Sequence, residues 1–261
     1  MKRWVPLFIA VAAVSVVLPR TTFAQSATAG ISLQWANCFG GAGALTSKNF
    51  ACNISTGAEV MYVSFVPPGG MTELVGFSCV IDVHTDQSAL PPWWDITPIG
   101  GAGNCRATST ISGNFGFTGG PFDCMDPWSG QASGGTSSNF LQVNGDPTRV
   151  RINSVCAVAL TSAIIPDSTQ QYYGASVSVN HSKTTGAGLC AGCNFGACIR
   201  LNDVRLSQTL AGGGDLYFTS TSPTLPGSVQ QIFWNTDPAA PTCTFTPTRK
   251  ETWGQIKSLY R

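Results

Sequence analysis

The sequence predicts an all-β protein: a disulfide-stapled β-sandwich followed by a short C-terminal helix. Three observations indicate this class. Many segments alternate apolar with polar residues and are rich in β-branched and aromatic side chains; Gly, Pro and Asp clusters separate them; and only 10% of residues are charged. Hardly any window before residue 248 keeps a helical period, so strands and turns must form the core.

The segments predicted as strands share this alternation and these turn boundaries. They are 59–66, 73–84, 106–117, 149–161, 171–181, 198–208, 215–219 and 229–234. The patterns of 73–84 and 171–181 are similar, and each follows an apolar strand and a Pro-containing turn. The sequence therefore predicts two related half-units, 25–130 and 131–247, joined in one sandwich.

The first residues have the plan of a secretory signal peptide. Met1, Lys2 and Arg3 precede an apolar run from Trp4 to Leu18, and small residues stand before Gln25. The run is short for a membrane span, and the rest of the chain offers no second candidate. We expect residues 1–24 to be removed and the protein to be secreted or held at the cell surface, with no membrane span.

The charge balance argues against a nucleic-acid partner. Without Lys2, Arg3 and Arg20, the fourteen basic residues of the chain fall to eleven, against thirteen acidic ones. No basic patch precedes the last fifteen residues, whereas nucleic-acid binding requires one.

The cysteines are predicted to form disulfides, because an exported chain with an even number of them folds in an oxidising compartment. The ten are Cys38, Cys52, Cys79, Cys105, Cys124, Cys156, Cys190, Cys193, Cys198 and Cys243. Three of them lie in the stretch "GLCAGCNFGACI", where zinc binding or thiol redox chemistry are the alternatives. Neither is favoured, since zinc needs free thiolates and a redox C-x-x-C opens a helix after a strand. No metal site and no cofactor are therefore expected.

Spacing suggests particular pairs. Cys38 is expected to close locally on Cys52, and Cys105 on Cys124, because each pair flanks a single loop or hairpin. Alternation places Cys79 and Cys156 on the core faces of apolar strands, so a bridge between them is expected to join the two half-units. The remaining four cysteines, Cys190, Cys193, Cys198 and Cys243, can pair in more than one way.

Loop tryptophans are the candidate ligand-binding residues. "ALPPWWDI" places Trp93, Trp94 and Asp95 after two stiffening prolines, and "FDCMDPWSG" places Asp126 and Trp128 beside a cysteine. Rigid aromatic faces next to carboxylates suit stacking on sugar rings or anchoring a protein partner. The alternative is that these tryptophans cap the open ends of the sandwich.

Catalytic motifs are weak. The sequence has no G-x-S-x-G and no H-E-x-x-H, and the register of the two histidines, His84 and His181, sets them on opposite strand faces. A glycan hydrolase needs only two suitably spaced carboxylates, and the candidates are Asp82, Asp95, Asp123 and Asp126.

The last residues, 248–261, are predicted to form an amphipathic helix. Thr248 and Glu251 are spaced as a capping box, and Trp253, Ile256 and Tyr260 form an apolar stripe. A helix this short needs a docking surface. That surface is either the protein's own acidic body or a partner that reads the tail as an export or attachment signal.

The closing segment "PTRKETWGQIKSLYR" resembles the end of a group of exported bacterial proteins of unknown function, and "CAGC" before "LNDVRLSQ" is similar as well. This resemblance implies a bacterial, exported protein and carries no activity or site. Together, the observations favour a non-enzymatic binding or structural module whose partner is an extracellular glycan or surface protein, with a secreted glycan-active hydrolase as the alternative.

Overall fold

The computed structural model describes residues 28–96, 105–106, 110–116, 124–141, 146–219 and 221–236. The predicted signal peptide 1–24, Cys243 and the tail residues Trp253, Ile256 and Tyr260 lie outside the described residues.

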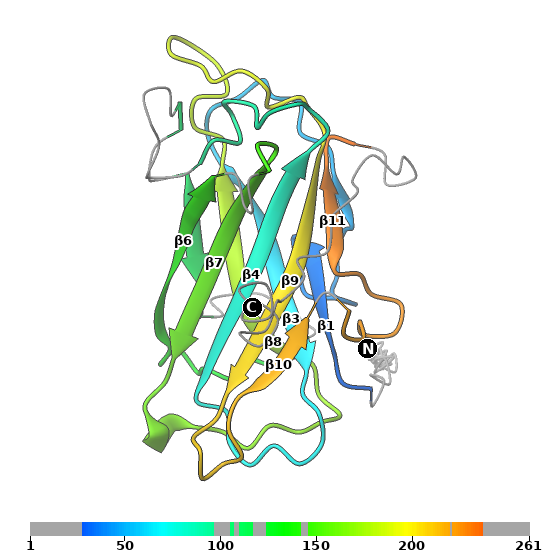
Figure 1. Ribbon diagram of the computed structural model, residues 1–261, viewed down its shortest axis with the longest axis vertical. Helices are drawn as coiled ribbons and strands as arrows, with labels where there is room; N and C mark the ends of the chain where they lie inside the picture. Colours follow the sequence, from blue (N-terminus) through cyan, green and yellow to red (C-terminus); the bar gives the residue numbers. More distant parts are fainter. Residues whose placement is uncertain are drawn as a thin grey trace, which may run out of the picture.

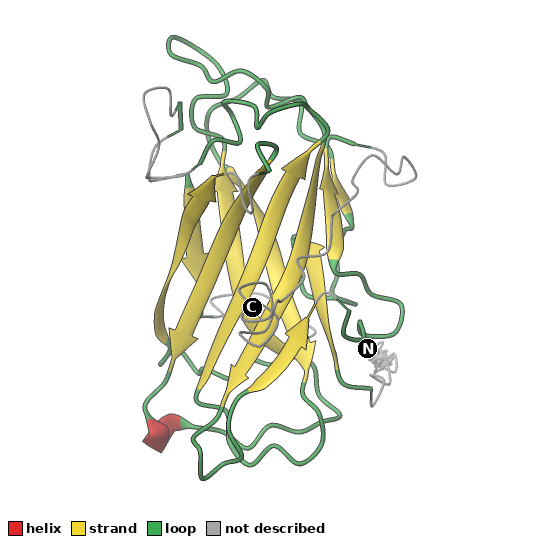
Figure 2. Cartoon of the chain, in the orientation of Figure 1, coloured by secondary structure: helices red, strands yellow, loops and turns green. Residues whose placement is uncertain are grey.

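Two packed sheets form the described chain, which confirms the predicted β-sandwich (Figures 1 and 2). The smaller sheet has the order β1 (Gly30–Trp35), β3 (Ala58–Val66), β8 (Tyr172–Asn180) and β5 (Ile111–Asn114). The larger sheet has the order β2 (Ser47–Lys48), β11 (Gln231–Trp234), β9 (Ala197–Ser207), β4 (Gly76–Thr85), β7 (Arg149–Ala157) and β6 (Ser133–Leu141), and β10 (Leu216–Thr219) also pairs with β9. The short 3-10 helix η2 (Leu160–Ser162) stands apart from the sheets (Figure 2).

The core lies between the two sheets and is built by the alternation that predicts the strands. Val63 and Val177 point inward from the smaller sheet, Ile81 and Ile152 from the larger one, and all four are fully buried. Phe65 of β3 stacks on Phe77 of β4 with ring centroids 5.9 Å apart, which joins the two layers.

Each sheet contains strands from both predicted half-units. β4 pairs with β7 on one side and β9 on the other, and β3 pairs with β8. The segments 25–130 and 131–247 therefore interleave, and neither forms a sheet alone.

The expected Cys79–Cys156 bridge is absent, because both residues carry unpaired, buried thiols in the described structure. They do face the core, but from neighbouring strands of the same sheet: Cys79 lies opposite Ser154, and Cys156 lies opposite Phe77. A diagonal pair in one antiparallel ladder lies roughly 7 Å apart, farther than the Cβ separation of about 3.8 Å that a disulfide needs. Strand pairing therefore joins the halves here.

Candidate functional site

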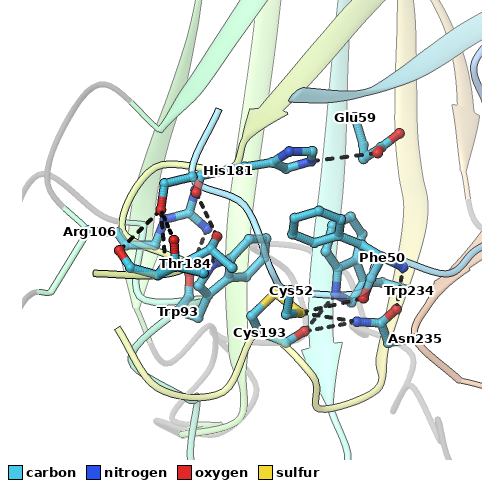
Figure 3. Close-up of a disulfide and its surroundings, with 12 residues drawn as sticks. Phe50, Cys52, Glu59, Trp93, Arg106, His181, Thr184, Cys193, Trp234 and Asn235 are labelled. Carbon is cyan, nitrogen blue, oxygen red and sulfur yellow. Dashed lines mark hydrogen bonds and ion pairs between the residues drawn. A yellow bond between two sulfur atoms is a disulfide. The ribbon is translucent and has the colours of Figure 1, made fainter. Parts of the chain in front are cut away.

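The candidate site is the end of the sandwich where β4, β8 and β11 finish and β3 and β9 begin, called here the loop end. Loops 50–57, 86–96 and 181–196 meet there, and Figure 3 shows their contacts. The strand order explains why these loops meet, because antiparallel pairing brings the last residues of β4 and β11, Thr85 and Trp234, to the same residue of β9, Ala197.

Two long-range disulfides fasten the loop end. Cys52 bonds Cys193 over 141 residues of sequence, and Cys105 bonds Cys190 over 85 residues. The local closures expected for Cys52 and Cys105 are therefore wrong, because the fold brings distant loops together at this end. A third bridge joins Cys38 to Cys124, replacing both of their expected local partners.

The stretch "GLCAGCNFGACI" is thus a staple, as its context predicts. Cys190 and Cys193 each bind a different loop, and Cys198 is itself disulfide-bonded. Within the described ranges no group of His, Cys, Asp and Glu residues is arranged to hold a metal ion.

A cluster of four tryptophans fills the loop end beneath these disulfides. Trp234 stacks on Trp93 with centroids 5.2 Å apart, meets Trp94 edge-on at 5.6 Å and lies 5.9 Å from Trp35. The indole of Trp93 donates to Thr184 Oγ1, and that of Trp234 donates to the carbonyl oxygen of Cys193. These indoles are buried, so they cap the sandwich and present no stacking face to solvent.

Trp128 is also buried, at the opposite end of β8. Its indole donates to Gly174 O near the start of β8, and its amide donates to Asp126 Oδ1. The stretch of β8 from Gly174 to Asn180, about 20 Å for six residues, separates this group from Trp93, Trp94 and Asp95. The structure therefore does not bring the predicted ligand-binding residues together, and it corrects the role predicted for the three indoles from ligand contact to packing.

Arg106 lies buried over the face of Trp93, with its guanidinium carbon 3.9 Å from the ring centroid. It donates to the carbonyl oxygen of Trp93 at 3.0 Å and to that of Asn180, so it ties the β4 loop to the end of β8. Burial lowers the pKa of Arg106 to about 9, because its contacts are carbonyl oxygens and an aromatic ring.

His181 completes the cluster on the other side. Its ring stacks on Phe50 at 3.9 Å between centroids, and Nδ1 lies 2.8 Å from Thr56 O. Nε2 lies 3.5 Å from Glu59 Oε1, and the other oxygen of Glu59 pairs with Lys48 at 2.6 Å. His181 is therefore a packed histidine that secures loop 50–57 (Figure 3).

Apolar side chains remain exposed on the fastened loops. Ile54 belongs to the loop held by Cys52, while Leu189 and Phe195 belong to the loop held by Cys190 and Cys193. Ser55 Oγ accepts from the amide of Thr185 at 2.9 Å, which sets the two loops side by side. The loop end thus presents three exposed apolar side chains on a backbone that the two disulfides hold in place.

Two of the four carboxylates proposed for hydrolysis, Asp82 and Asp126, have structural partners. Both oxygens of Asp82 accept from Arg151, at 2.7 and 2.9 Å, on the outer face of the larger sheet. Asp126 accepts from a backbone amide, and Asp123 lies outside the described residues. These contacts give the hydrolase alternative no support.

Sequence reasoning missed Arg106, Phe50, His181 and the exposed pair Leu189 and Phe195. The sequence placed His181 only on the opposite strand face from His84 and did not predict that it would be buried. The cysteine spacing around Leu189 and Phe195 was the one local sequence pattern that pointed to this site. The contact between Phe50 and His181 joins residues 131 positions apart, so no local pattern could predict it.

No protein-family model and no curated protein matches the chain. Solved structures similar to it include two from Acetivibrio cellulolyticus. One is a type II cohesin domain from the cellulosome, with a TM-score of 0.34, 9% identity, and coverage of 80% of this chain and 95% of that chain. The other is the second type II cohesin module of the adaptor ScaA scaffoldin, with a TM-score of 0.36, 12% identity, and coverage of 85% and 97%. Likeness at this level carries no argument about function.

In the described part of the chain, no helix has the length and apolar character needed to cross a bilayer.

Proposed function

We propose that this protein is an exported, non-enzymatic module that binds a protein partner outside the cell through its loop end. The observation that carries the proposal is that two long-range disulfides, which close 141 and 85 residues of sequence, fasten loops on which Ile54, Leu189 and Phe195 stay exposed. The signal-like first residues and the disulfides fit an oxidising compartment.

Rigidity is the physical reason to favour binding at this end. A loop that is ordered before it meets a partner loses less conformational entropy on binding, so more of the contact energy becomes affinity. The disulfides, the tryptophan cluster and Arg106 supply that order through contacts that the partner does not have to create.

The exposed side chains favour a protein over a glycan. Leu189 and Phe195 are apolar, and apolar anchors surrounded by polar groups characterise the centres of protein interfaces. Sugar stacking relies on open aromatic faces, and the indoles of Trp93 and Trp94 are buried.

A capture experiment tests the proposal. The mature protein is immobilised and offered secreted and surface proteins from its source cells, and retained proteins are quantified by mass spectrometry. We expect Leu189→Ser combined with Phe195→Ser to reduce the retained partner about tenfold or more, because two central anchors are lost. Leu210→Ser is the matched control, since Leu210 is 95% exposed in the turn between β9 and β10 at the other end of the sandwich.

Equal capture by the double variant and the wild type would contradict the proposal. Loss of capture after enzymatic removal of glycans from the offered proteins would contradict the choice of a protein partner. Thermal unfolding of each variant shows that a loss of capture does not come from a loss of the fold.

A further inference from the structure

Three loops form the end of the sandwich opposite the loop end, called here the far end. β7 and β9 finish there on either side of the start of β4, because Gly76 pairs with both Ala157 and Ser207. The loops are 67–75 between β3 and β4, 158–171 between β7 and β8, and 208–215 between β9 and β10. Figure 1 shows the turn between β9 and β10 at this end, and Figure 2 shows η2, which belongs to loop 158–171, in red there.

Hydrogen bonds join these loops to one another. The amide of Leu74 donates to the carbonyl oxygen of Ile164 at 2.8 Å. Thr72 Oγ1 donates to the carbonyl oxygen of Gly212 at 2.9 Å. Because two residues so close in sequence each hold one of the other loops, the three loops form one connected surface.

The three most exposed large apolar side chains of the described chain lie on this surface. Leu210 is 95% exposed, Ile165 78% and Leu160 60%, whereas Leu189 and Phe195 at the loop end are 54% and 39% exposed. Single exposed apolar side chains are ordinary on a protein surface, but a group of them on connected loops marks an interaction site.

The charges of the far end have one sign. The three loops contain Glu73, Asp167 and Asp215, and they contain no lysine, arginine or histidine. Asp215 lies 3.6 Å from Arg205 of β9. Neither Glu73 nor Asp167 forms an ion pair with a basic side chain of the described residues. The far end is therefore both apolar and negatively charged.

We propose that the far end is an interaction surface, separate from the loop end, that binds a protein segment carrying lysine or arginine side chains beside apolar ones. Apolar side chains of the partner cover Leu210, Ile165 and Leu160, and its basic side chains face the carboxylates.

Charge selects this occupant over two others. The carboxylates repel anionic lipid head groups, and they repel the identical far end of a second copy of the chain. A basic protein segment meets no such repulsion. The inference goes beyond the proposed function and does not depend on it, because the two surfaces lie at opposite ends of the sandwich.

Peptide binding to the full mature chain tests this inference. The probe is a short, fluorescently labelled synthetic peptide with leucines on one helical face and lysines on the other, and the matched peptide has glutamate in place of each lysine. We expect fluorescence anisotropy to give a Kd at least tenfold lower for the lysine peptide. We expect Ile165→Ser combined with Leu210→Ser to weaken its binding at least tenfold, and Leu189→Ser combined with Phe195→Ser to leave it unchanged. These substitutions change exposed side chains, so the variants are expected to fold, and thermal unfolding checks this.

Equal binding of the two peptides, or equal binding by the far-end variant and the wild type, would overturn the proposal. Binding that appears only when Lys250 and Lys257 are changed to glutamate would show that the chain's own basic tail is the occupant. Binding of phosphatidylglycerol vesicles that is lost in Leu210→Ser would show that the occupant is a membrane. Either of these last two results would overturn the choice of a separate basic partner.

Discussion

At the scale of single residues, Arg106 shows how this fold uses a buried charge. Its guanidinium donates to one carbonyl oxygen in the loop after β4 and one at the end of β8, and it covers the ring of Trp93, so it replaces hydrogen bonds that water would otherwise make. Arg106 thus joins two separate segments at the loop end, as the two disulfides there do.

Arg106→Met keeps the length of the side chain and removes its donors. We expect the free energy of unfolding to fall by about 2 kcal/mol or more, because the carbonyl oxygens of Trp93 and Asn180 stay buried without a donor. Lys183→Met is the control, since Lys183 is exposed and donates to Cys105 O, and we expect it to cost under about 0.5 kcal/mol. Urea unfolding measures both values, and an equal cost for the two variants would contradict the role of Arg106.

The two core thiols give a second prediction at this scale. Burial raises the pKa of both Cys79 and Cys156 to about 12, so neither is a thiolate at neutral pH. We expect iodoacetamide to modify neither residue in the native protein and both residues after unfolding without reductant. Mass spectrometry counts the added groups, and an absence of modification after unfolding without reductant would restore the Cys79–Cys156 bridge.

At the scale of elements, alternation identified the strands that bury one face. The predicted segments 59–66, 171–181 and 198–208 agree closely with β3, β8 and β9. The strands β1 and β6 were missed for different reasons. β6 reads "SGGTSSNFL", which is typical of a loop, and β1 is a short segment close behind the signal-like residues.

A glycine allows β6 to pair closely with β7. A Cβ on Gly134 would lie 2.1 Å from the carbonyl oxygen of Val155, whereas a Cβ on Gly135 would meet nothing within 4 Å. Close packing of β6 against β7 therefore requires glycine at 134 and not at 135.

Gly134→Ala is expected to lower the free energy of unfolding by about 1–3 kcal/mol, because the obstacle is backbone and β6 must shift away from β7. Gly135→Ala is expected to be neutral or slightly stabilising, since it restricts the unfolded chain without a clash. Thermal and urea unfolding of the two variants measure the difference, and equal stability would contradict this pairing of β6.

At the scale of the whole molecule, the fold class followed from the sequence, but the site did not. Alternation and turn residues act over a few positions, and they define an all-β chain. The disulfide pairs, the Trp93–Trp234 stack and the Phe50–His181 stack depend on which strand ends meet, and that is set by topology. Spacing therefore suggested local bridges where the molecule has bridges across 85 to 141 residues.

The same long-range connections hold the loops through which the protein is proposed to bind. A sandwich whose two predicted halves interleave is stabilised along its strands, and the disulfides then fix the loops at one end. The protein partner and the export of the chain are proposals built on this frame.

The central claim is that the loop end is rigid before any partner binds, and hydrogen exchange of loop 185–195 tests it most directly. In the oxidised protein we expect the Thr185 and Cys190 amides, bonded to Ser55 Oγ and Lys183 O, to exchange slowly, as the amides of β8 do. In the Cys52→Ala/Cys193→Ala protein we expect these amides to exchange at least tenfold faster while β8 is unchanged. Rapid exchange of this loop in the oxidised wild-type protein would contradict the account.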